Sequence, residues 1–252
     1  MNKMIAIMQP TYMPWLGYFS MIDQVEEFVF LDNVQLVNRS WQVRNKIKFN
    51  DAEKMLTIPV DKSKHRDDRQ IYNTKYYGVE WKDSHLGSIR LAYSKSQYFM
   101  EVMPFLNDLY LGDYNSIGDM NERFIIEICK KIGINTKFYF SKEMNVEGHK
   151  DKLLVDICKK LNADAYLSAM GSASYIESEN PAGEFGRCGI ELYYLNYDHP
   201  EYKQIGNGFI PYIGIYDLIF NVGLNDALEI IREGQRENIT SDEFRRMHLS
   251  KI

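Results

Sequence analysis

The chain has 252 residues, 45% of them hydrophobic, which is enough for one large domain or two small ones with a core that needs no cross-links. Its formal net charge of −5 comes from interspersed basic and acidic residues, so no basic stripe favours DNA binding. No run reaches the roughly 20 apolar residues that span a bilayer. The three scattered cysteines and an N-terminus without a leader pattern predict a cytoplasmic protein with reduced thiols.

Hydrophobic periodicity predicts strands that alternate with helices along most of the chain. Strands are expected at residues 3–8, 27–32, 136–141, 165–169 and 190–197, with the last one closing the sheet. Helices are expected at residues 15–25, 81–95, 99–111, 116–132, 150–162, 215–222 and 224–234. A two-stranded ribbon is expected over residues 41–49 and 53–60, with its turn at Asn50-Asp51.

This alternation predicts an α/β fold, with a mostly parallel sheet covered by helices on both faces. Residues 1–235 are expected to form a single α/β domain, in which residues 81–132 are a helical inserted layer or subdomain. Residues 236–252 are interpreted as a C-terminal tail. The charged segment 61–70, "DKSKHRDDRQ", has no apolar anchor and is expected to be mobile or to become ordered on ligand binding.

The turn after the first strand, "MQPTYMPWLGY", combines prolines with polar and aromatic side chains. In an open parallel sheet, ligands bind outside the carboxyl ends of the strands. Gln9 can donate and accept hydrogen bonds, while Tyr12 and Trp15 can stack on a substrate or wall it. The alternative interpretation is that the prolines only shape the start of the following helix.

A second polar cluster follows the strand at residues 27–32 and includes Asp32, Gln35, Arg44 and Asn45. Because the two strands are expected to be neighbours, we predict one pocket, lined by Gln9, Tyr12, Asp32, Gln35 and Asn45. The alternative is turn chemistry followed by a solvated ribbon.

His85 and His199 are the candidate general bases, since only histidine titrates near neutral pH without a large shift. His85 lies on one face of a predicted helix, where it is either a core histidine or a base that points into the cleft. Asp217, in the apolar helix start "IYDLIF", either stabilises the helix N-terminus or faces the cleft and holds His199, Arg44 or a substrate ammonium.

Several ordered motifs resemble the WbqC-like family, from about residue 5 to residue 224: "QPTYMPWLGYFSMID", "VFLDNVQ", "SWQVRNKIK", "TIPV", "YLSAMGSASYI", "HPEYKQ" and "YDLIFNVG". The resemblance marks many of the same residues and adds, within its motifs, Ser168, Tyr175, Tyr202 and Gln204. The chain departs from the usual sequence pattern of the family at Asn33, Ala169 and Gly214. Asn33 stands where a second aspartate is common, so an Asp-Asp pair at residues 32 and 33 is absent.

The resemblance implies a role in the biosynthesis of bacterial O-antigen, part of lipopolysaccharide, or of another surface polysaccharide. The implied reaction is transfer of glycine or a related aminoacyl or acyl group from an activated donor to a nucleotide-linked amino sugar. One alternative is an ATP-dependent ligase that forms an acyl-adenylate, and another is a non-catalytic module that binds a sugar nucleotide. Nucleotide, nicotinamide and zinc motifs are absent, so no metal and no cofactor is identified beyond optional ATP; a homodimer is left open.

Overall fold

A computed structural model of the protein describes residues 2–37, 39–61, 63, 65, 68–178 and 180–248. Four residues of the charged segment 61–70, namely Lys62, Lys64, Arg66 and Asp67, lie outside the described residues. The prediction that this segment is mobile therefore lies in part outside the described residues and stays a prediction.

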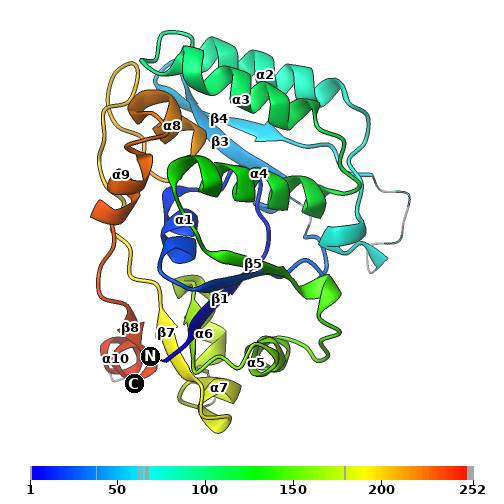
Figure 1. The fold of residues 1–252 in the computed structure, drawn as a ribbon, viewed down its shortest axis with the longest axis vertical. Helices are drawn as coiled ribbons and strands as arrows, with labels where there is room; N and C mark the ends of the chain where they lie inside the picture. The colour runs from blue at the N-terminus through cyan, green and yellow to red at the C-terminus, as the bar shows by residue number, and fades with distance from the viewer. Residues whose placement is uncertain are drawn as a thin grey trace.

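The central sheet contains six strands in the order β5-β2-β1-β6-β7-β8 (Figure 1). Their bounds are β1 Met4–Met8, β2 Glu27–Phe30, β5 Lys137–Phe140, β6 Ala165–Ser168, β7 Glu191–Tyr194 and β8 Ile239–Thr240. The first five strands in this order pair in parallel, and β8 pairs antiparallel with β7. The mostly parallel α/β sheet is confirmed, but β7 does not close it, because β8 adds one more strand at that edge.

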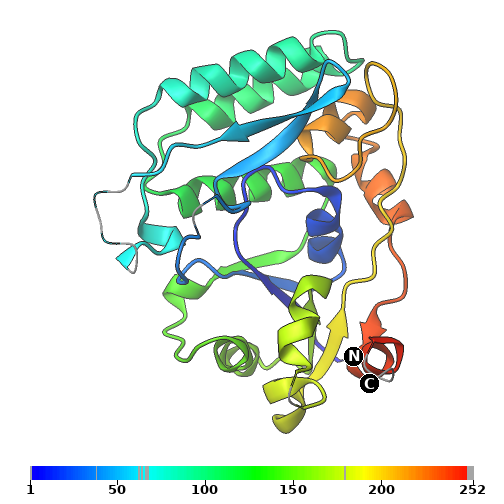
Figure 2. The same ribbon diagram turned by 180° about the vertical axis from the view of Figure 1, so that it is seen from behind.

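Helices cover both faces of the sheet, as Figures 1 and 2 show. Their bounds are α1 Leu16–Asp23, α2 Glu80–Tyr93, α3 Phe99–Leu111, α4 Ile117–Ile132, α5 Asp151–Lys160, α6 Ala173–Ile176, α7 Gly183–Arg187, α8 Tyr216–Val222, α9 Ala227–Glu233 and α10 Ser241–His248. Short 3-10 helices are η2 Ile71–Asn73, η3 Ser141–Glu143 and η4 Met170–Ser172. Alternation along β1 sends Ala6 into a core with α1, α4, α8 and α9, and sends Ile5 and Ile7 into a second core with α5 and α7.

A separate hairpin lies above the first of these cores, and its strands are β3 Arg44–Phe49 and β4 Ala52–Thr57. The turn residues Asn50 and Asp51 both have positive φ, 50° and 60°, as a two-residue type I′ turn requires. Helices α2 and α3 lie over the hairpin, whereas α4 lies between the hairpin layer and the sheet (Figure 1). The added layer therefore consists of the hairpin with α2 and α3, rather than of residues 81–132.

Helix α4 shows why the sequence predicts its bounds well. The Ser116 side chain accepts a hydrogen bond from the Asp119 backbone N–H (3.0 Å) at the N-terminus, and Gly133 takes a left-handed φ of 90° at the C-terminus. Apolar residues at helical spacing, such as Phe124, Ile125 and Ile128, are buried in the core.

The C-terminal residues are structured through residue 248, unlike the expected tail. Strand β8 leads directly into α10, whose Phe244 is buried in the second core. The buried Glu177 accepts hydrogen bonds from the Tyr194 and Ser241 hydroxyls (both 2.7 Å), and the Arg245 guanidinium lies 3.3 Å from its carboxylate. These long-range contacts hold the C-terminal helix against the sheet.

Candidate functional site

The order in which the chain adds strands to the sheet reverses between β1 and β6. From β1 the chain builds β2 and β5 on one side, and it then builds β6 and β7 on the other side. Such a topological switch point is where open α/β sheets bind ligands. The turn after β1, predicted to lie at the carboxyl end of the first strand, starts at this point.

A cavity of about 270 Å³ lies beside this turn, and we call it the aromatic hollow. It is lined by Met8, Thr11, Pro14, Trp15, Tyr18, Trp41, Asn45 and Tyr212. Tyr212 meets the Trp15 ring edge-on, with centroids 5.5 Å apart, and Trp41 is 49% exposed at the surface. Aromatic walls with one open side suit a ring that is apolar on its faces and polar at its rim.

His199 packs against the wall of the aromatic hollow. Its ring stacks on Trp15 (centroids 6.2 Å apart) and meets Tyr212 edge-on (4.9 Å). Its Nδ1 lies 3.0 Å from the Pro200 carbonyl oxygen, which can only accept, so Nδ1 carries the proton and Nε2 the lone pair. Nε2 is buried without a hydrogen-bond partner, and burial lowers the pKa of His199 below 6.5. The neutral imidazole therefore has a basic nitrogen that makes no hydrogen bond with the described part of the chain.

His85 is placed differently, because it lies in the core under the hairpin. Its Nε2 donates to the Thr57 carbonyl oxygen (3.2 Å), and its Nδ1 accepts from the Tyr12 hydroxyl (2.8 Å). Burial lowers the pKa of His85 to about 4. Both nitrogens have partners, so the geometry favours the core histidine over the base.

The turn after β1 is braced from inside by polar side chains. Asn45 donates through Nδ2 to the carbonyl oxygens of Tyr12 (3.0 Å) and Met13 (2.6 Å), and Gln42 donates to Gln9 Oε1 (2.5 Å). Tyr12 is fully buried, and its hydroxyl also bonds that of Tyr110. Its ring therefore has no face open to a ligand, and Asn45 acts mainly as a brace.

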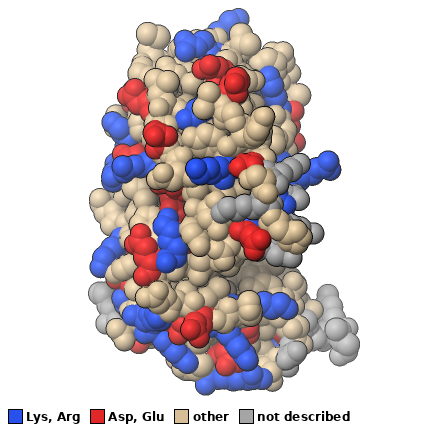
Figure 3. Space-filling model, turned by 90° about the vertical axis from the view of Figure 1, so that its right-hand side faces the viewer, with Lys and Arg blue, Asp and Glu red and all other residues tan. Residues whose placement is uncertain are grey.

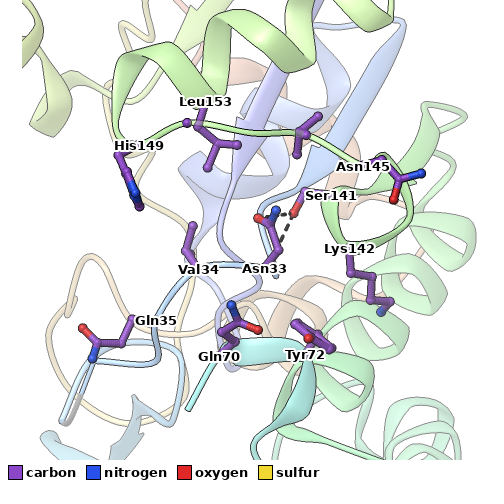
Figure 4. A pocket seen from close by; sticks show the side chains of 12 residues that line it. Asn33, Val34, Gln35, Gln70, Tyr72, Ser141, Lys142, Asn145, His149 and Leu153 are labelled. Atoms are coloured by element: carbon purple, nitrogen blue, oxygen red, sulfur yellow. Dashed lines mark hydrogen bonds between the residues drawn. The ribbon is translucent and has the colours of Figure 1, made fainter. Parts of the chain in front are cut away.

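A larger cavity of about 640 Å³ lies at the carboxyl ends of β2 and β5, and we call it the polar hollow (Figure 4). It is lined by Asn33, Val34, Gln35, Gln70, Tyr72, Ser141, Lys142, Asn145, Val146, Gly148, His149 and Leu153. Gln35 lines this hollow and Asn45 lines the aromatic one. The five residues expected in one pocket are therefore divided, with Tyr12 buried beneath.

Asp32 sits under the polar hollow in a charge cluster with Lys142 and Glu122. The Lys142 Nζ lies 3.0 Å from Asp32 Oδ2 and 3.1 Å from Glu122 Oε2. Asp32 Oδ1 also accepts from the Ser141 hydroxyl (2.9 Å) and the Lys142 backbone N–H (2.8 Å). Burial, and then the nearby Asp32 carboxylate, raise the pKa of Glu122 to about 8, so it holds a proton at neutral pH. Helix α4 thus places a second acidic residue beside Asp32, as a protonated carboxyl group at neutral pH.

Asp217 is fully buried, and its partners are tyrosines rather than His199 or Arg44. The hydroxyls of Tyr93 and Tyr202 donate to its two oxygens (3.0 and 2.9 Å). Burial raises the pKa of Asp217 to about 6. Asp217 therefore links α2 and the loop after β7 to α8, and it forms no salt bridge with the described residues.

Replacing Asp217 with asparagine is expected to flatten the pH dependence of stability between about pH 3.8 and pH 6. The native carboxyl holds its proton up to about pH 6 and the unfolded one only to 3.8, so its contribution is present at low pH and is lost as pH rises through about 6. The difference is on the order of 3 kcal/mol. Urea unfolding at several pH values measures the free energy of unfolding, with Asp198→Asn, at an exposed residue, as the control. If the free energy of unfolding of Asp217→Asn changes with pH as it does in the unsubstituted protein, the prediction is contradicted.

The remaining expected site residues are scattered over the structure. Ser168 bonds the Ser172 hydroxyl (2.5 Å) at the end of β6, and Tyr175 is exposed on α6. Gln204 closes its own loop through two hydrogen bonds with the Ile210 backbone, both 2.9 Å. Arg44 Nε is buried without a partner.

Lys142 and Tyr212 line the two hollows, Glu122 pairs with Lys142, and none of the three was predicted as a site residue. Glu122 could have been identified from the sequence, because it is an acidic residue three positions before Ile125, in the apolar stripe of α4.

Within the described residues, no helix is long and apolar enough to cross a membrane, and no three or more His, Cys, Asp or Glu side chains group as metal ligands. Figure 3 shows basic and acidic side chains interspersed over one face.

The mostly parallel sheet with two hollows at its carboxyl edge defines an α/β protein. A model of the WbqC-like protein family matches residues 9–229. A mycobacterial protein, "Uncharacterized protein Rv1507c" of Mycobacterium tuberculosis (strain ATCC 25618 / H37Rv), is 32% identical over 223 residues, covering 88% of this chain and 94% of that protein. The chain belongs to the WbqC-like family. No solved structure matches it.

Proposed function

We propose that the protein transfers a glycyl or related acyl group to the amine of a nucleotide-linked amino sugar, within surface-polysaccharide biosynthesis in the cytoplasm. The observation that carries the proposal is His199, a neutral imidazole with an unpartnered Nε2 against the wall of the aromatic hollow. The family resemblance supports the choice of acceptor and acyl group.

In the proposed reaction, the sugar ring packs against Trp15 and Trp41, and its amine faces His199. Nε2 removes the amine proton while the nitrogen attacks the acyl carbonyl carbon of the donor. The new C–N bond forms, the bond to the leaving group breaks, and the imidazolium returns the proton to that group. Nε2 is covered in the structure, so a neighbouring ring has to move before substrate reaches it. The proposal assigns this movement to Tyr212, which is exposed and meets the His199 ring edge-on.

Arg44 supplies the positive charge in this proposal. It precedes Asn45 on β3 but does not line the aromatic hollow, and its Nε lacks a partner. The proposal assigns it to the substrate phosphates or the developing oxyanion. Asn45, which was expected to share this task, is occupied with the turn.

Mass spectrometry of turnover tests the proposal. The protein is incubated with nucleotide-linked amino sugars and either glycyl-tRNA or ATP with glycine, and the expected product is heavier by one glycyl unit. Product that depends on ATP and appears with AMP identifies the acyl-adenylate route. Tight binding of the sugar nucleotide without product under either condition contradicts the transferase and supports a binding module.

A further inference from the structure

The polar hollow takes no part in the acyl transfer proposed above, although it is the larger of the two cavities. Its volume of about 640 Å³ falls within the 300–1,000 Å³ typical of small-molecule sites. It lies at the carboxyl ends of β2 and β5, where an open sheet binds ligands. We infer that the polar hollow binds a nucleoside phosphate.

The walls of the hollow suit a flat, polar ring. Leu153 lies on one side and Tyr72 and Gln70 on the opposite side, with Val34 between them (Figure 4). Tyr72 is 38% exposed and can offer a ring face for stacking on a base. Leu153 and Val34 can contact the apolar faces of the same base. A nucleobase fits such a slot better than a bulky aliphatic group does.

The polar groups of the hollow are mostly carboxamides, which both donate and accept. Asn33, Gln35, Gln70 and Asn145 all line it. A carboxamide pairs with the edge of a base through two hydrogen bonds, as asparagine and glutamine do with adenine. Neutral groups of this kind select a neutral ring rather than an ion in that part of the hollow.

Cationic side chains are present for the phosphate. The Lys142 ammonium donates to Glu122 Oε2 (3.1 Å) and forms an ion pair with Asp32 Oδ2 (3.0 Å), and it has three hydrogens, so at least one remains for a phosphate oxygen. Next to Gln70, Arg69 is only 8% exposed, yet its Nε and Nη1 have no partner. Arg69 does not itself line the hollow, but burying two unpaired guanidinium nitrogens is costly, and an anion bound beside Gln70 reduces that cost.

This inference rests on the proposed function only for the origin of the ligand. The nucleoside phosphate is either the nucleotide of the amino-sugar substrate or ATP used to activate the acyl group. Binding itself requires neither donor nor acceptor, so it can be measured without turnover. Failure of acyl transfer and failure of this site are therefore separate results.

Calorimetric titration of the full chain with UDP, dTDP, ADP and ATP tests the site. At least one should bind with Kd below about 1 mM, and Tyr72→Ala should weaken it about 5- to 150-fold, the range for loss of one stacked base. Tyr72→Phe keeps the ring and should bind within about threefold of the unsubstituted protein. Tyr77→Ala removes a more exposed tyrosine that does not line the hollow, and should change nothing.

The nucleotide that binds most tightly shows whether the hollow binds the sugar nucleotide or the activating nucleotide. Preference for UDP or dTDP assigns the hollow to the nucleotide-linked sugar, and preference for ADP or ATP assigns it to the activating nucleotide. The inference is overturned if none of the four binds below about 1 mM, or if inorganic phosphate alone binds as tightly. It is also overturned if Tyr72→Ala and Asn145→Ala both bind like the unsubstituted protein.

Discussion

The His199→Gln protein is expected to form the amide about 10²- to 10⁴-fold more slowly than the unsubstituted protein, with little change in KM. Glutamine is polar and of similar length, but it cannot take a proton near neutral pH. The wall of the aromatic hollow keeps Trp15 and Tyr212, so binding of the sugar ring should persist. Steady-state kinetics by mass spectrometry, once donor and acceptor are identified, measure both parameters.

The pH profile separates a base from a merely structural histidine. Burial lowers the pKa of His199 below 6.5, so the rate should stay level from pH 8 down to about 6.5 and decline only at lower pH, where the imidazole becomes protonated. The matched control is His248→Gln, which changes an exposed histidine on α10 that packs on Phe244. A His199→Gln protein as fast as this control rules out His199 as the base.

Replacing Lys142 with methionine should destabilise the protein more than replacing Lys130, which forms a surface ion pair with Glu127. It leaves Asp32 and Glu122, whose side chains are 0% and 4% exposed, without their shared cation. Breaking a buried pair in this way costs about 3–5 kcal/mol, and the lower end is expected because the Lys142 side chain is 27% exposed. Urea unfolding at pH 8 measures the loss.

The loss should be smaller at pH 5. The pKa of Glu122 is about 8 in the folded protein and 4.5 in the unfolded chain, so its contribution is present below about 4.5 and is lost as pH rises through about 8. A protonated Glu122 needs no cation, so removing Lys142 costs less. Lys130→Met, which removes the surface pair with Glu127, is the control and should cost under about 1 kcal/mol. Equal effects of the two substitutions at pH 8 would show that the charge cluster is not stabilised by Lys142.

Local patterns predict the sheet and most helices because each element carries its own period. The helix at 99–111 is observed with those bounds, and the ribbon turns at Asn50-Asp51 as expected. Strand β8 has only two residues and was missed, since two residues show no alternation.

The candidate site is harder to predict, because its chemistry depends on contacts between distant segments. Asp32 was found from its place after β2, but its partner Lys142 lies 110 residues further along the chain. The helical spacing placed His85 on a buried face, yet only the position of Tyr12 shows that its Nδ1 is occupied. His199 and His85 resemble each other as sequence signals and differ in which nitrogens have partners.

The antiparallel pairing of β8 with β7 has a consequence for solubility. A parallel sheet that ended at β7 would present the backbone N–H and C=O groups of Tyr193 and Tyr194 to other chains, which is a route to edge-to-edge aggregation. Tyr193 and Tyr194 instead pair with Thr240 and Ile239, and α10 follows at once. The last described segment of the chain therefore shields this stretch of the sheet edge from intermolecular strand pairing.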